Sequence, residues 1–269
     1  MLTFNEEAEQ YLCAAILRPG NAPATRGAVG ILRRLVGLLR AAFPTARIRV
    51  RLDGGFAATE IFAYLDGEPR LDYVVAMGSN PVLQREAEPW MGVVRPRAAR
   101  ISQNAHVYGT CTYQARTWGR PRRLIIKAGV TVTAGREPRD NPRFVVTNLP
   151  QSAQFLYERV YCARGDIENR IKELHDGVAL GRTSCPRFWA NQLRVLLSAA
   201  AYILLQEVRL RAAGTRWALA QVWTLRQNVL KLGAQLIGSV RRHWLRLPAA
   251  YPYRADWQRL ARALGAQAP

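Results

Sequence analysis

The order of hydrophobic periodicities constrains the fold of this chain more than any other feature. Residues 46–53 (ARIRVRLD) alternate apolar and basic side chains, which is typical of a strand that ends at Asp53. Residues 58–67 (ATEIFAYLDG) then have helical spacing, and residues 71–77 (LDYVVAM) form an apolar run typical of a buried strand. Together with an amphipathic helix over residues 28–43, this pattern predicts an α/β core.

Two changes of pattern divide the rest of the chain. Residues 90–150 contain β-rich runs separated by Gly, Pro and Asn, and no helix is expected among them. After residue 154 we expect helices to the end, including one long helix over residues 216–247. Residues 1–18 predict a hairpin around the polar turn NEEAEQ. We therefore expect a core over 1–89, an all-β insertion over 90–150, a core helix over 151–183 and carboxy-terminal helices over 184–269.

The charge of the chain indicates a polyanionic partner. It has 39 basic and 19 acidic residues, a formal net charge of +20. Binding to phosphates by so many cations is favoured because it releases counterions, so nucleic acid is the expected partner, ahead of membrane surfaces. Only three basic residues are lysine, and genomic base composition could explain Arg in place of Lys. Genomic base composition explains a net excess of twenty positive charges less well.

Cysteine, histidine and hydropathy patterns argue against several protein classes. The four cysteines and three histidines do not form the clustered spacing of a zinc site, and free thiols fit a cytosolic chain. No uncharged apolar run reaches about 18 residues, so no membrane span is expected. The polar, acidic amino terminus does not resemble a signal peptide. We expect a cytoplasmic protein.

A charged stripe marks residues 161–177 (YCARGDIENRIKELHDG). On a regular helix Arg164, Glu168 and Lys172 recur every four positions, with Tyr161 and His175 three residues beyond either end. An adjacent apolar stripe is expected to dock the helix and consists of Ile167, Ile171 and Leu174. The charged stripe alone is equally explained as a solvated face, and Gly177 as the residue that ends the helix.

Several segments in order resemble the DDE transposases of bacterial insertion sequences, in the cut-and-paste branch with a β-rich insertion. Tyr161, Arg164, Glu168 and Lys172 resemble the Tyr-Arg-Glu-Lys signature of that family, and RLDGGFA resembles the segment with its second catalytic aspartate. The later segments GREPRDNPRFVVTNL and TSCPRFWANQLRVLLSAAAYILLQ also resemble it. The resemblance implies a ribonuclease H-like fold, Mg²⁺ or Mn²⁺, and cleavage and joining of double-stranded DNA at transposon ends.

The resemblance assigns roles to individual residues. Asp53 and Glu168 would be catalytic metal ligands, because phosphodiester cleavage by two ions needs carboxylates that hold hard, oxygen-seeking metals. Tyr161, Arg164 and Lys172 would contact DNA phosphates. His175 stands where the family pattern has a further lysine, which puts that phosphate contact in doubt because histidine is mostly neutral at pH 7.

Two assignments have equally ordinary alternatives. Asp53 lies in a DGG sequence, which is also common turn chemistry. Trp118 lies beside arginines in RTWGRPRR and could stack on a flipped base at a DNA end, or it could pack in the core.

The first of the three family carboxylates is missing from its expected place. It should lie on the first strand of the core, yet no aspartate occurs between Met1 and Leu52, and the three glutamates there fall in the predicted hairpin turn. We therefore expect an amino-terminally truncated transposase with an incomplete ribonuclease H-like core. It should bind metal weakly and be inactive by itself, because two ligands hold an octahedral ion poorly.

Other functions remain possible on the sequence alone. The chain could be a non-catalytic DNA-binding protein at transposon ends, a homodimer, or a partner of an intact transposase through its carboxy-terminal helices. A basic RNA-binding or structural protein is disfavoured, since the sequence lacks the stacking-sheet motif of common RNA modules.

Overall fold

A computed structural model describes residues 1–5, 7, 9–241 and 243–266, apart from the side chains of 164–166. The chain divides into two compact units, which we describe separately. The core unit comprises Pro19–Gly165. The helical unit combines Met1–Arg18 with Asp166–Pro269.

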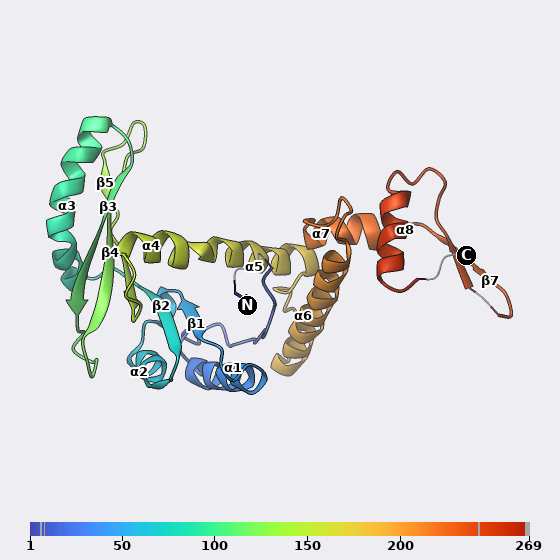
Figure 1. The fold of residues 1–269 in the computed structure, drawn as a ribbon, viewed down its shortest axis with the longest axis horizontal. Coiled ribbons are helices and arrows are strands. Elements are labelled where there is room, and N and C mark those ends of the chain that lie inside the picture. The colour runs from blue at the N-terminus through green and yellow to red at the C-terminus, as the bar shows by residue number, and fades with distance from the viewer. Residues whose placement is uncertain (6, 8, 242, 267–269) are drawn as a thin grey trace. The chain divides into compact units, whose positions relative to one another are not determined.

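The core unit is built on one mixed sheet (Figure 1). Strands β1 (Ile48–Leu52) and β2 (Leu71–Met77) run parallel and are connected through helix α2 (Thr59–Gly67), as the sequence predicted. The strand order is β1-β2-β6-β4-β3, and every pair after β1–β2 is antiparallel. The short β5 pairs antiparallel with the carboxy-terminal end of β4. These further strands are β3 (Ala105–Tyr113), β4 (Arg122–Thr131), β5 (Arg139–Asp140) and β6 (Arg143–Thr147).

Alternate residues of the central strands β2, β4 and β6 reach two separate apolar clusters. Tyr73 and Val75 of β2 join the larger cluster, which also contains buried residues of α1 (Ala28–Ala42), α2 and α3 (Pro81–Ile101). Val74 joins the cluster on the other face, beneath Leu156 and Val160. Because successive side chains on a strand point to opposite faces, both faces of β2 are covered, and this explains the apolar run from Tyr73 to Met77.

Helix α3 corrects the prediction that no helix lies between residues 90 and 150. It continues to Ile101, and the predicted boundary at residues 89 and 90 falls inside it. Pro89 and Pro96 lie within the helix, whereas its buried residues follow helical spacing: Leu83, Ala87, Met91, Val94 and Ala98. The predicted all-β stretch therefore begins only after Ile101, and its strands extend the sheet of β1 and β2 instead of forming a separate body.

The helical unit contains fewer long helices than the sequence predicted. Its main helices are α5 (Gly165–Val178), α6 (Phe188–Arg211) and α8 (Arg254–Ala263). The helix expected over residues 216–247 is absent from the described residues. That region instead holds the short α7 (Val222–Leu225), a π-helical turn (Arg226–Leu230) and a hairpin of β7 (Gln235–Gly238) and β8 (His243–Arg246).

Among its described residues, the amino-terminal segment of the helical unit forms a single bridge in place of the predicted hairpin, and residues 6 and 8 of the predicted turn lie outside the described residues. Leu2 and Tyr11 make one isolated antiparallel bridge, with N–H to O distances of 2.8 and 2.7 Å. Side chains of α6 hold the rest of the segment: the Gln192 Oε1 atom accepts from Leu17 N at 2.8 Å, and Gln206 Nε2 donates to Gln10 O at 2.8 Å. Contacts to a helix therefore replace a second strand.

Helix α6 is long and apolar enough to cross a membrane by length and composition alone, and it is the one such helix among the described residues. This is weak evidence, because the core helix of a soluble protein meets the same test. Only 28% of its apolar window is buried, although Gln206 and Arg209 of α6 are buried and bonded to other parts of the helical unit.

Candidate active site

Asp53 lies directly after β1, where the sequence placed it. Its backbone is extended, and its Oδ1 atom accepts a hydrogen bond from Gly55 N at 2.9 Å. This bond caps a single 3-10 turn, Gly54–Phe56. The turn chemistry anticipated for DGG is therefore present. It also orients a half-buried carboxylate at the end of a core strand.

The segment before α5 is not one regular α-helix. It consists of α4 (Ala153–Phe155), a π-helix (Leu156–Tyr161) and a 3-10 turn (Cys162–Arg164). Because these turns have different numbers of residues, the predicted four-residue stripe does not run regularly from Tyr161 to Glu168. The side chain of Arg164 lies outside the described residues.

Tyr161 belongs to an aromatic and polar group on the π-helix. Its ring lies 5.4 Å from that of Tyr157, which lies 5.6 Å from the ring of Tyr108 on β3. The Tyr108 hydroxyl donates to Glu158 Oε1 at 3.0 Å. Burial raises the pKa of Tyr157 to about 12, so this hydroxyl is protonated at neutral pH. These contacts hold the π-helix on the sheet.

Helix α5 presents the second half of the predicted stripe to solvent. Glu168, Lys172 and His175 are all exposed, and their spacing of four and three residues places them on one face of the helix. This part of the prediction is confirmed. A neighbouring group also interacts with Glu168, so its carboxylate is not isolated.

The buried face of α5 differs from the predicted one. Leu174 is buried, but Ile171 is 45% exposed and Ile167 only partly covered. Glu173 is buried instead. Gly177 is buried too, and a Cβ atom there would lie 2.9 Å from Val222 Cγ1. Gly177 therefore allows close packing and does not end the helix.

The turn after α5 uses a different residue from the predicted glycine. Ala179 adopts a φ of 53°, in the left-handed region, immediately after the helix. Leu180 N then donates to Leu174 O at 3.0 Å, which satisfies a carbonyl of the last turns.

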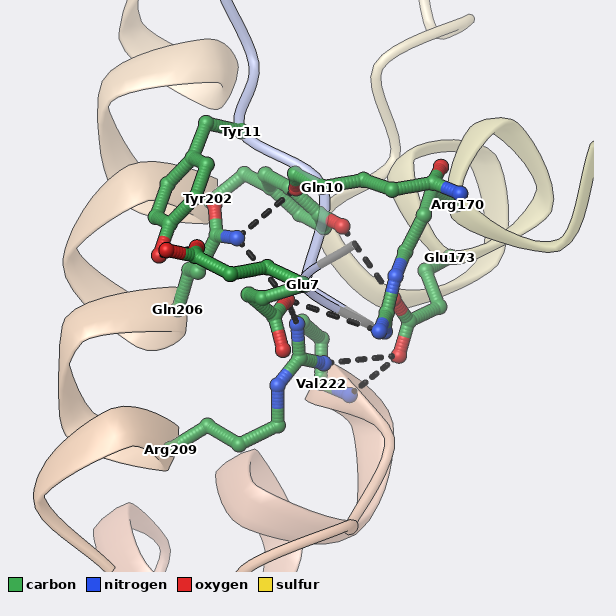
Figure 2. Close-up of polar contacts among 10 residues, drawn as sticks. Glu7, Gln10, Tyr11, Arg170, Glu173, Tyr202, Gln206, Arg209 and Val222 are labelled. Carbon is green, nitrogen blue, oxygen red and sulfur yellow. Dashed lines mark hydrogen bonds and ion pairs between the residues drawn. The ribbon is translucent and has the colours of Figure 1, made fainter. Parts of the chain in front are cut away.

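Glu173 is the centre of a buried polar network that sequence reasoning missed (Figure 2). Its carboxylate accepts from Arg170 Nη1 at 2.9 Å, Tyr202 Oη at 3.1 Å and Val222 N at 3.1 Å. The Arg209 guanidinium pairs with both Glu173 and Glu9. The network therefore joins α5, α6, the start of α7 and the amino-terminal segment.

Two opposing effects set the acidity of Glu173. Burial alone raises its pKa, but the hydrogen bonds from Arg170 and Val222 N and the charge of Arg209 outweigh burial and lower the pKa below its usual value. Glu173 is thus a buried carboxylate held ionised by its donors. The sequence contained a signal for this network. Arg170 and Glu173 are three residues apart, which is the spacing of an ion pair on a helix, and Glu173 directly precedes Leu174, which was predicted to dock the helix.

Trp118 is part of the core, which favours the packing alternative over stacking on a DNA base. Its side chain is only 5% exposed. Its ring lies 4.8 Å from that of Phe62 and 5.4 Å from that of Tyr113, and the Arg122 guanidinium lies 4.7 Å from its centroid. The adjacent arginine therefore serves a cation–π contact inside the unit.

Comparison with known protein families identifies the family of this chain. The family Transposase DDE domain group 1 matches residues 1–268. The chain belongs to this family. Transposases of this kind act on DNA, and DDE transposases generally use divalent metals. A comparison with curated proteins gave no match.

The transposase residues fit a divalent metal in chemistry but do not form a complete ligand set. Carboxylates such as Asp53 and Glu168 suit Mg²⁺ or Mn²⁺. Within the described part of the chain, however, no three His, Cys, Asp or Glu side chains gather where they could hold an ion.

Proposed function

We propose that this chain acts on DNA as the catalytic part of an insertion-sequence transposase with a ribonuclease H-like core. The family match over residues 1–268 carries this proposal. Two observations support it: Asp53 follows β1 directly, and Glu168 is exposed on α5. Both carboxylates serve as metal ligands in the proposal.

The proposed division of labour follows from the chemistry of each side chain. A bound divalent metal would supply Lewis-acid activation of a phosphodiester bond. Lys172, exposed on α5, binds a DNA phosphate as a point charge, and Arg164 and Tyr161 bind others. His175 makes a weaker contact because it is mostly neutral at pH 7.

No third carboxylate is assigned to the proposed metal site. No aspartate occurs in residues 1–52. Glu9 is engaged elsewhere, since it pairs with Arg209 and Arg170. Strand cleavage by this chain alone should therefore be slow. The same observation favours a second candidate function, a non-catalytic protein that binds transposon DNA.

The proposal is tested by metal and DNA binding measured separately on the full chain. Mn²⁺ titration followed by electron paramagnetic resonance should show at least about tenfold weaker binding in Asp53→Asn and in Glu168→Gln, as expected when one ligand is lost. Glu60→Gln is the matched control, because Glu60 is an exposed carboxylate on α2 in the core unit.

The outcomes of these measurements distinguish the transposase from the non-catalytic DNA-binding protein. Equal Mn²⁺ affinity in all four proteins would refute the ligand roles of Asp53 and Glu168. Failure to bind duplex DNA at low salt would refute the transposase proposal. Rapid metal-dependent nicking would confirm the enzyme and overturn the expectation of slow cleavage, whereas DNA binding without Mn²⁺ binding would establish the second candidate.

A further inference from the structure

Half of the net charge of the chain lies in its last 62 residues. Residues 208–269 contain 11 Arg and Lys residues against one acid, Asp256, a net charge of +10 out of +20. Asp256 already pairs with Arg216, 3.4 Å away. Within the described residues, no ion pair involves the four arginines Arg241, Arg246, Arg254 and Arg262. This region therefore has a large uncompensated positive charge.

Among the described residues of this region, no third strand pairs with the β7–β8 ribbon. Its pairs Gln235 with Arg246 and Ile237 with Trp244 share one face, and every residue of both strands is exposed. An isolated two-stranded ribbon is at best marginally stable in water. Its exposed apolar and basic side chains thus favour a partner that covers it.

Residues of α8 and of this ribbon line one groove. Figure 1 shows α8 and β7 as neighbouring elements near the carboxy terminus. Leu260 is buried, and Trp257 Nε1 donates to Val229 O at 3.1 Å, so one side of α8 is anchored to the helical unit. The groove has a volume of about 1430 Å³. Its lining includes ribbon residues Gln235, Trp244 and Arg246 and α8 residues Arg254, Gln258 and Arg262.

The three arginines converge on the groove from both walls. On α8, Arg254, Gln258 and Arg262 are four residues apart and therefore lie on one face. Arg246 comes from the opposite wall, on the ribbon face that also holds Trp244. A groove with arginines on both sides and little acid nearby complements a phosphate backbone, because guanidinium groups bind phosphate oxygens in a bidentate manner.

We propose that the β7–β8 ribbon and α8 form a binding surface for duplex DNA. The ribbon enters the major groove, and the adjacent sugar–phosphate strand lies between the ribbon and α8. The B-DNA major groove is about 12 Å wide and admits a two-stranded ribbon. The major groove of A-form RNA is deep and narrow, so the same ribbon fits RNA poorly. None of these residues takes part in the proposed cleavage.

Salt dependence of DNA binding tests this surface on the full chain. In the triple variant Arg246→Gln, Arg254→Gln, Arg262→Gln, the slope of log affinity against log salt concentration should fall by about 2.7, since each phosphate contact contributes about 0.9. The corresponding triple Arg→Lys variant keeps the charges and should keep most of the slope. If the slope falls equally in the Arg→Gln and Arg→Lys triple variants, the substitutions have disturbed the fold, and circular dichroism detects that loss of structure independently.

A second triple variant controls for net charge. Arg34→Gln, Arg97→Gln and Arg100→Gln remove three exposed arginines from α1 and α3 in the core unit. This variant should keep the wild-type slope. The proposal is overturned if the groove Arg→Gln variant keeps the wild-type slope, or if it and the core-unit Arg→Gln variant lose the slope equally. It is also overturned if the groove Arg→Gln substitutions weaken binding to duplex RNA or to phosphatidylserine vesicles more than binding to duplex DNA.

The two proposals fail in different ways. Asp53→Asn and Glu168→Gln should weaken Mn²⁺ binding without changing the salt slope. The groove variant should change the slope without changing Mn²⁺ affinity. A protein that does not bind metal therefore still permits the DNA surface to be tested.

Discussion

The Arg51 guanidinium donates a hydrogen bond to the carbonyl oxygen of Val160, at 3.0 Å and across 109 residues of sequence. Arg51 lies two residues before Asp53, and Val160 directly precedes Tyr161. Within the core unit, the strand that precedes the candidate catalytic residue Asp53 is therefore bonded to the π-helix that carries Tyr161, a candidate phosphate contact.

Replacing Arg51 should loosen this link. We expect Arg51→Met to lower the free energy of unfolding by about 1 kcal/mol, because a partly exposed, charge-assisted hydrogen bond is lost. Urea denaturation measures the change. Arg49→Met is the matched control on the same strand, since Arg49 is exposed, and it should change stability by less than about 0.5 kcal/mol. Equal losses in the two variants would contradict a specific role for the bond.

Neutralising Glu173 should destabilise the helical unit strongly. In Glu173→Gln the buried Arg209 loses one carboxylate partner, and breaking such a pair typically costs about 3 kcal/mol. Thermal unfolding followed by circular dichroism should show a clear loss. Glu207→Gln removes an exposed partner of Arg211 on the same helix and should cost at most about 0.5 kcal/mol. A comparable cost at the two positions would argue against the network.

The same residue should make stability depend on acidic pH. The pKa of Glu173 is lowered in the folded chain from its ordinary value of 4.5, so the stability it contributes is fully present above that value. This contribution is lost as the pH falls through the lower, folded-state pKa. Urea unfolding at a series of pH values should therefore show a steeper acidic decline in the wild type than in Glu173→Gln. Parallel declines would refute the assignment.

Alanine at two helical glycines should have opposite effects. Gly177→Ala places a Cβ atom 2.9 Å from Val222 Cγ1 and should destabilise by about 1–3 kcal/mol through overpacking. Gly37→Ala, in α1, meets nothing within 4 Å and should stabilise by up to about 1 kcal/mol through helix propensity. Adding Val222→Ala to Gly177→Ala should recover part of the loss. Without this coupling, the close approach of α5 and α7 would be disproved.

Trp118→Ala should act on stability and not directly on DNA binding. Removing a buried Trp typically costs about 3–5 kcal/mol, and Trp118 contacts Phe62, Tyr113 and Arg122. Trp189→Ala is a suitable comparison, because that side chain is 78% exposed and its loss should cost little. Full stability with lost DNA affinity in Trp118→Ala would restore the stacking hypothesis.

Local patterns determined the elements whose periodicity was unbroken. The helix over residues 28–43, strand β1, helix α2 and strand β2 all lie where alternation and helical spacing predicted them. The position of Asp53 after a strand and the shared exposed face of Glu168 and Lys172 were predictable for the same reason, since each depends on neighbours within a few residues.

Predictions failed where a local signal was weaker than contacts made in the folded chain. No helix was predicted over residues 90–150, yet α3 continues to Ile101, with Met91 and Val94 buried in the larger apolar cluster. The helix expected after residue 216 is broken into short turns and a ribbon. Hydrophobic spacing there was compatible with several structures, and tertiary packing chose among them.

The sequence by itself determined the α/β order of the core, the excess of positive charge and the presence of the family's signature residues. Only the tertiary structure decided which face of α5 is buried, whether Trp118 is available to DNA, and where the uncompensated arginines converge. The physical reason is distance along the chain. Glu173 is buried because Arg209 and Val222 supply donors from 36 and 49 residues away, and no local periodicity encodes such a partner.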